Sequence, residues 1–181
     1  MSIDALVAAA PEARGRLIIF LMFSMGLRCI GVANLRVEDI DYVSKVLIVK
    51  EKFGNERRLP ITAVVQRAIE NYLAECPART GPLIRGQRRH LQHEGVQAAS
   101  IGKMVAEWMR AAGIKRYGGD GRNAHALRHT ALTEPAEATG DAFLAQELAR
   151  WSSPATAAHY VRRASTERLR AALAKRDEVQ Q

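Results

Sequence analysis

A histidine and an arginine three positions apart are the residues whose types and spacing first suggest chemistry. His125 and Arg128 fall in a stretch that favours a helix, so this separation puts both side chains toward one face. An imidazole beside a guanidinium suits an anionic, oxygen-rich group such as phosphate, because a guanidinium can bind two oxygens at once. Alone the pair is a weak signal, since His-x-x-Arg occurs by chance in many helices.

His129 opens a second interpretation, in which two histidines four positions apart hold a metal ion. Arg128 lies inside that segment and would repel a cation, and the glutamate of the helical zinc-protease motif is absent. We therefore expect no metal here. His129 and the more distant His159 are interpreted as supporting residues that hydrogen-bond to others.

Other segments complete an ordered set around the pair. Gly26-Leu27-Arg28 stands upstream, Lys52 lies in a polar connection between two extended runs, and Trp151 precedes Tyr160 by nine positions. With this order the chain resembles the tyrosine recombinases, the family of phage integrases and chromosome-dimer resolvases, from about residue 12 to about residue 163. The family's catalytic set matches Arg28, Lys52, His125, Arg128, Trp151 and Tyr160.

The resemblance implies that Tyr160 attacks a DNA phosphodiester and holds the broken strand as a 3′-phosphotyrosyl ester, without metal, ATP or other cofactor. DNA has no 2′-hydroxyl, so the protein must supply the nucleophile. Two guanidiniums, Arg28 and Arg128, would clamp the non-bridging oxygens of the transition state. Lys52 is then the candidate general acid for the leaving 5′-oxygen, and His125 accepts the tyrosine proton or binds phosphate.

Two of these roles have limits that the residue types impose. Trp151 offers only an indole N–H, so it can hold an oxygen but cannot transfer protons. Lys50 competes with Lys52 for the role of general acid, and Lys52 better matches the family's spacing.

Three positions depart from the family pattern: Gly31 replaces a common acidic residue, Arg150 replaces a glycine, and Pro135 should kink or end its helix.

The composition fits a chain that meets a polyanion. Its 181 residues carry a formal net charge of +8 and are 48% hydrophobic, which excludes a disordered chain, a disulfide scaffold and an acidic carrier. Nucleic acid is the first candidate partner and an anionic membrane the second. Given the resemblance, we expect double-stranded DNA as partner and backbone contacts from Arg57, Arg58, Arg85, Arg88, Arg89 and Lys115.

Two cysteines, Cys29 and Cys76, are too few for a disulfide framework and are expected in a reducing compartment. The longest apolar run, residues 17–23, is too short to cross a bilayer. We expect a cytoplasmic protein that joins the nucleoid when it acts.

The elements that must position these residues form a mainly α pattern with a small antiparallel β-sheet, an α+β fold. Helices are expected from Pro11 to Gly26, around 30–35, after Thr62, over 101–112, near 124–138, 142–150 and 154–162, and from Ser165. Residues 46–49 and 57–61 are expected to pair as a hairpin, with a third short strand at 82–85. Residues 78–97 are expected to form an irregular basic loop and 115–123 a Gly-rich basic loop.

The whole chain is expected to be one catalytic domain, with a core over about 12–163 and a C-terminal helix and tail over 164–181. Its length leaves no room for the N-terminal clamp domain that usually accompanies the family. The tail, with Leu169 and Leu173, could dock on a neighbouring copy or close its own core. On DNA the resemblance implies a homotetramer, with a monomer or weak oligomer when free. Two alternatives stay open: a type IB topoisomerase, and a non-catalytic DNA-binding module that keeps the fold.

Overall fold

The computed structural model describes the backbone of residues 2–10, 12–50, 56–86 and 94–139, with the side chains of these ranges as far as Ala131. The chain divides into two compact units, Met1–Ala131 and Leu132–Gln181. The first unit holds the described elements except the last turns of the final helix, and it is the unit described below. The expectation of one catalytic domain over the whole chain stays a prediction.

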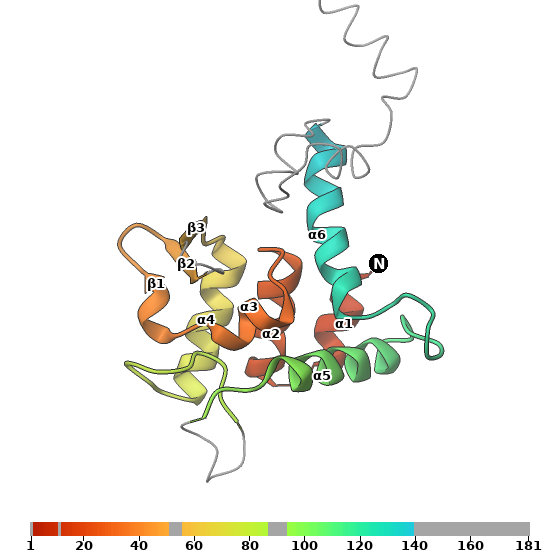
Figure 1. Ribbon diagram of the computed structural model, residues 1–181, viewed down its shortest axis with the longest axis horizontal. Coiled ribbons are helices and arrows are strands. Elements are labelled where there is room, and N and C mark those ends of the chain that lie inside the picture. The colour runs from red at the N-terminus through yellow and green to blue at the C-terminus, as the bar shows by residue number, and fades with distance from the viewer. Residues whose placement is uncertain (1, 11, 51–55, 87–93, 140–181) are drawn as a thin grey trace, which may run out of the picture. The chain divides into compact units, whose positions relative to one another are not determined.

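The first unit is mostly helical with one small sheet, which confirms the predicted α+β class (Figure 1). Its helices are α1 (Ile3–Ala9), α2 (Ala13–Phe23), α3 (Cys29–Asn34), a short 3-10 turn η1 (Val37–Asp39), α4 (Ala63–Glu75), α5 (Ala98–Ala111) and the start of α6 (Ala124–Thr139). Its strands are β1 (Ile40–Asp41), β2 (Val46–Lys50) and β3 (Glu56–Pro60).

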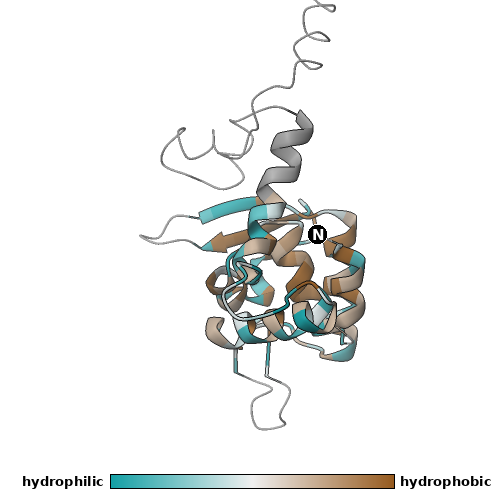
Figure 2. Ribbon diagram, turned by 90° about the vertical axis from the view of Figure 1, so that its right-hand side faces the viewer, coloured by the Kyte–Doolittle hydropathy of each residue, from teal (hydrophilic) through white to brown (hydrophobic). Residues whose placement is uncertain are grey.

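Helix α2 is the centre of the core. It contacts α1, α3, α4 and α5, and Leu17, Ile18, Leu21 and Met22 are at most 1% exposed. Figure 2 shows that hydrophobic segments lie mostly on the packed helices and hydrophilic ones along the connecting loops. Burial on this scale stabilises α2 and thereby fixes the position of the segment that follows it, which carries Arg28.

The predicted hairpin is confirmed, with β2 antiparallel to both β1 and β3 in the order β1-β2-β3. Leu47 pairs with Leu59, and both face the core. The predicted third strand at 82–85 is wrong, because this segment makes only isolated bridges, between Arg36 and Pro82 and between Arg85 and Gly95. Pro82 has no N–H with which to extend these bridges into a ladder of backbone hydrogen bonds. The third strand of the sheet is β1.

Several helix ends follow the predicted signals. The Thr62 side chain accepts a hydrogen bond from the Val65 amide at 3.4 Å and caps α4. Gly113 follows α5 with φ of +68°, as expected of a C-terminal glycine. Pro135 does not end α6, which continues to Thr139. A proline lacks only its own N–H, so the helix bonds on either side of it can still form.

Helix α1 has no counterpart in the sequence-based expectations, and α2 begins at Ala13 rather than Pro11. The sequence of α1 is short and weakly patterned, but Ser2 caps it by accepting a bond from the Ala5 amide at 3.3 Å. Leu6 and Ala10 are fully buried, so α1 is held by packing against α2 and α5.

A close approach between α2 and α5 occurs at Gly15. A Cβ atom placed there would lie 3.0 Å from the ring of Trp108 and 3.1 Å from the Cβ of Ala10. Gly15→Ala should therefore lower the melting temperature by several degrees, since overpacking costs about 1–3 kcal/mol and exceeds the gain in helix propensity. Thermal unfolding followed by circular dichroism measures this.

The matched control is Gly102→Ala on α5, where the added Cβ would come no closer than 4.0 Å to Cys29. This variant should raise the melting temperature, because alanine favours a helix over glycine by about 1 kcal/mol. An equal rise in both variants would contradict the tight packing of Trp108 on Gly15.

Candidate functional site

Arg128 connects the start of α6 to the segment that follows α2. It is 5% exposed, and its Nη1 donates a hydrogen bond to the carbonyl oxygen of Gly26. Gly26 has φ of +62°, a conformation that glycine adopts without strain. The buried Ala124 and Leu127 fix the same turns of α6 against the core. The guanidinium is therefore held in place by both a carbonyl and packing.

Arg28 lies two residues beyond that carbonyl, at the N-terminal cap of α3. Its backbone is extended and its side chain is exposed. Because Arg128 binds the Gly26-Leu27-Arg28 segment directly, the two predicted phosphate-binding arginines come from backbone segments that are joined to each other. Cys29, next in the chain, is not an activated thiol, since burial raises its pKa.

His125 lies in the first turn of α6 and is exposed, as is His129 one turn later. The His125 amide donates to the side-chain oxygen of Asn123 at 2.8 Å, which fixes the start of the helix. The sequence predicts a shared face for His125 and Arg128, and the structure places one outside and the other inside. A helix rotates by about 100° per residue, so a spacing of three leaves about 60° between two side chains and lets them straddle the edge of the core.

Lys50, the competitor of Lys52, has a partner of its own at the end of β2. Its Nζ lies 3.3 Å from a carboxylate oxygen of Asp39, which is buried and also accepts the Arg36 amide at 2.8 Å. A lysine whose charge balances a buried carboxylate is poorly suited to donate its proton elsewhere. This pairing favours Lys52 as the acid, and Lys52 itself lies outside the described residues.

Arg57 and Arg58 are neighbours on β3, so their side chains point to opposite faces of the sheet. Arg57 is half-buried. Arg58 is exposed and its Nη2 lies 3.5 Å from a carboxylate oxygen of Asp41. An exposed ion pair of this kind contributes little to stability and can exchange for a phosphate.

Arg85 and Lys115, which the sequence predicts as DNA-backbone contacts, are bonded to groups within this chain. The Arg85 guanidinium is buried and donates to the carbonyl oxygens of Pro77 and Cys76. The Lys115 ammonium, with its side chain 8% exposed, lies 2.8 Å from Asp120 and also donates to the Arg122 carbonyl. Both groups stabilise irregular backbone, which composition alone cannot distinguish from a surface charge.

Five of the predicted residues lie outside the described ranges: Lys52, Arg88, Arg89, Trp151 and Tyr160. Gly31 lies inside them, and a Cβ there would meet only Leu27, at 3.9 Å. The place of the family's common acidic residue is therefore sterically open beside Arg28.

The loop before α6 contains functional candidates that the sequence analysis missed. It exposes Arg116, Tyr117 and Arg122. The available signal was an aspartate among glycines and basic residues, since aspartate commonly organises turns by accepting nearby amides.

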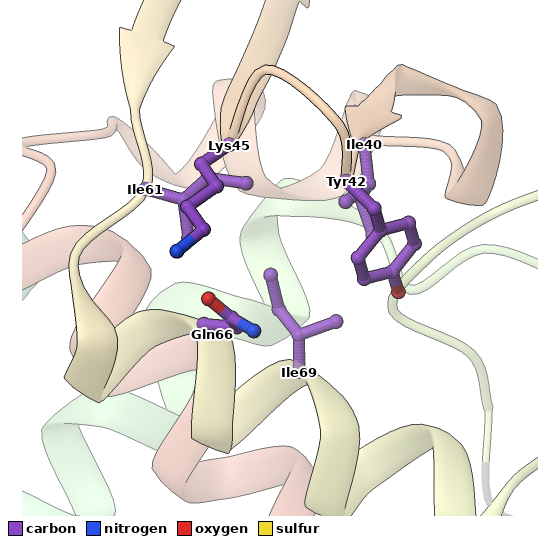
Figure 3. Close-up of a pocket in the computed structure, with 6 residues that line it drawn as sticks. All are labelled: Ile40, Tyr42, Lys45, Ile61, Gln66 and Ile69. Carbon is purple, nitrogen blue, oxygen red and sulfur yellow. The ribbon is translucent and has the colours of Figure 1, made fainter.

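Cavities among the described residues of the first unit lie away from the predicted site. One, of about 10 Å³, is an apolar seam between the sheet and α4 around Ile40, Ile61 and Ile69 (Figure 3). The other, of about 580 Å³, is an open groove between α2 and α4 around Arg16, Phe20 and Arg67. Neither is lined by any of the predicted site residues.

The described residues contain neither a metal-binding cluster nor a membrane-spanning helix. Among residues 2–10, 12–50, 56–86 and 94–139, no cluster of three or more His, Cys, Asp or Glu side chains could hold a metal ion. Over the same part of the chain, no helix has the length and apolar character needed to cross a bilayer.

Residues 2–167 match the phage integrase family, and the chain belongs to that family. It is 31% identical over 159 residues to the tyrosine recombinase XerA of Pyrococcus furiosus, which covers 86% of this chain and 52% of that protein. It is also 31% identical over 169 residues to the tyrosine recombinase XerC of Shewanella amazonensis, covering 88% and 53%. The resemblance drawn from the sequence is thereby confirmed.

The fold is shared with a solved structure of the XerH site-specific recombinase bound to its difH substrate in a pre-cleavage complex. The TM-score is 0.75 with 22% sequence identity, and the match covers 94% of this chain and 51% of that one. The chain spans about half the length of the curated relatives it matches.

Proposed function

We propose that this chain is the catalytic part of a site-specific DNA recombinase. Tyr160 attacks a phosphodiester of double-stranded DNA, the 5′-hydroxyl leaves, and the 3′ end stays attached as a phosphotyrosyl ester. Attack of a 5′-hydroxyl from another strand reverses the chemistry and releases the tyrosine. Each bond broken is replaced by one of the same kind, so the reaction needs no external energy source.

The observation that carries the proposal is the bond from Arg128 to the carbonyl of Gly26, two residues before Arg28. It joins α6, which carries Arg128, to the backbone segment that carries Arg28, although 100 positions separate the two arginines in the sequence, and this supports the proposal. Two guanidiniums at one site can bind the non-bridging oxygens of a phosphodiester and stabilise the charge that grows on them during attack.

The remaining roles complete the chemistry. Lys52 protonates the leaving 5′-oxygen, and His125, exposed on the first turn of α6, accepts the tyrosine proton or binds phosphate. Trp151 donates its indole N–H to a phosphate oxygen. Arg57, Arg58, Arg88 and Arg89 contact the DNA backbone. These roles need neither metal nor ATP, and exchange between two duplexes takes place in a homotetramer formed on DNA inside the cell.

A nicked suicide duplex tests this function. In such a substrate, cleavage releases a short fragment and the covalent protein–DNA adduct accumulates. We expect an adduct that survives denaturant, disappears with protease, and carries a label placed at the 5′ end of the scissile strand. Addition of EDTA should leave its yield unchanged.

Two other results would contradict the proposal. No adduct with any member of a library of candidate sites, despite DNA binding, would favour a non-catalytic DNA-binding module. Relaxation of supercoiled plasmid without sequence preference would favour a topoisomerase.

A further inference from the structure

The segment between α5 and α6 is a loop that is folded around one carboxylate. We call residues 114–123 the Asp120 loop (Figure 1). Asp120 accepts the Lys115 ammonium at 2.8 Å and the backbone amides of Arg116 and Arg122 at 2.9 and 3.0 Å. These bonds, that of Lys115 first, hold the pKa of the Asp120 carboxyl well below its usual range. The carboxylate therefore stays charged, and keeps its hydrogen bonds to the loop, across neutral and mildly acidic pH.

The loop is also tied at both ends and across its middle. The amides of Ile114 and Lys115 donate to the Met109 carbonyl of α5, each at 2.9 Å, and Asn123 caps α6. Arg122 reaches back to donate to the Ile114 carbonyl at 2.6 Å. Gly119 and Gly121 supply the left-handed turns, with φ of +85° and +73°. These bonds and turns define the shape of the loop in the unbound chain.

This fixed shape points two side chains away from the protein. Tyr117 is 67% exposed, one of the most exposed large hydrophobic residues among the described ones, and its neighbour Arg116 is exposed as well. The adjoining Gly118 and Gly119 face open space, so another molecule can approach the backbone closely there. The loop holds three basic residues against a single acidic one, and the side chain of that acid is only 7% exposed.

Arginine and tyrosine side chains and backbone amides are among the groups that bind the sugar-phosphate backbone of DNA. We propose that the Asp120 loop is a preformed DNA-contacting element, in which Arg116 and Tyr117 bind the duplex backbone next to the phosphate held by His125 and Arg128. Asp120 is its positioning residue. This inference rests on the proposed action on DNA. The ammonium of Lys115 is bonded within the loop, so the inference assigns the DNA contact to the two residues that follow it instead.

Substitution of Asp120 tests the proposal, because two explanations predict opposite changes in DNA affinity. Asp120→Ala makes the chain more basic by one charge, so electrostatics alone would tighten binding to DNA. Loss of the loop's organising group would weaken it instead. We expect about 3–10-fold weaker binding of a random-sequence 30-base-pair duplex, measured by fluorescence anisotropy with the full chain at about 50 mM salt. Asp120→Asn, which keeps one acceptor oxygen, should fall between Asp120→Ala and the parent.

The side chains themselves are tested against a charge-matched control. Arg116→Ala should weaken binding about 3–10-fold and reduce the slope of log K against log salt by about 1, while Tyr117→Ala weakens binding without changing that slope. Arg67→Ala, an exposed arginine on α4, should lose the same charge with a smaller effect. Melting temperatures within about 2 °C of the parent would show that the fold is intact, since this loop lies outside the core.

Several outcomes would overturn the proposal. These are equal losses in Arg116→Ala and Arg67→Ala, tighter binding by Asp120→Ala, or no binding of the duplex by the parent. A change in sedimentation without a change in DNA binding would assign the loop to contacts between copies of the chain. The adduct assay separates this proposal from the function: binding that depends on the loop, with no adduct from any site, would keep the loop's role and remove the recombinase.

Discussion

Tyr160→Phe should abolish the covalent adduct on a nicked suicide duplex while DNA binding stays within about twofold of the parent. Removing the phenolic oxygen removes the atom that bonds to phosphorus, so no residual cleavage through that route is possible. The expected loss is at least about 10³-fold, the usual scale when a nucleophile is removed. Single-turnover adduct formation on denaturing gels, with anisotropy for binding, measures both quantities.

The other three tyrosines give this prediction its controls. The Tyr72 hydroxyl is an internal acceptor for the Arg85 amide at 3.1 Å, and burial raises its pKa. Burial also raises the pKa of Tyr42, in the turn between β1 and β2, so neither is activated for attack. Tyr42→Phe should form adduct at the parent rate.

Tyr117 is the competing nucleophile, because it is exposed and lies eight positions before His125. Tyr117→Phe should still form adduct at saturating DNA, with any loss confined to the DNA concentration required. An adduct that survives in Tyr160→Phe and disappears in Tyr117→Phe would reassign the nucleophile.

Arg128→Lys is expected to have the second largest effect. In the proposed reaction the arginine binds the Gly26 carbonyl and a phosphate oxygen at the same time, and its planar guanidinium has donors on separate nitrogens for both. A lysine keeps the charge, but its three donors share one nitrogen and cannot reproduce the spacing of the guanidinium donors. Single-turnover cleavage should fall about 10²–10³-fold, the usual cost of losing one donor that stabilises a transition-state oxygen.

The control is Arg110→Lys, at an exposed position in the last turn of α5. It should cleave at the parent rate with an unchanged melting temperature. Gly26→Ala offers an independent check, because a left-handed φ of +62° disfavours a side chain by about 1–2 kcal/mol and its relief would shift the carbonyl that holds Arg128. Full cleavage activity in both Arg128→Lys and Gly26→Ala would contradict the assigned role.

Helices and strands that are marked by a hydrophobic period or by end signals were predictable from the sequence. The apolar face of α5 with its terminal glycine, the cap at Thr62 and the hairpin of β2 and β3 were all found as expected. Each depends on neighbours in sequence, where the physical signal is strong. Helix α1 was missed because its helical state comes from burial of Leu6 against distant helices.

The candidate site, like the fold, could be predicted from the sequence only in part. The identities of Arg28, His125 and Arg128 follow from motif order, but the carbonyl that holds Arg128 does not. The sequence also treats each basic residue as equally available, whereas Arg85 and Lys115 are bonded internally and Arg116 is exposed. That difference is set by side-chain direction in irregular segments, for which no periodic pattern exists.

The bond between Arg128 and Gly26 joins residues 102 positions apart, and this separation bears on when the protein becomes competent. Under the proposed function, the pair of phosphate-binding arginines is complete only after α6 has left the ribosome, so a nascent chain that has folded only α1 to α5 has Arg28 without Arg128. DNA cleavage would then be coupled to completion of the fold. Partial synthesis or local detachment of α6 would leave a chain without the paired arginines rather than an unregulated nuclease.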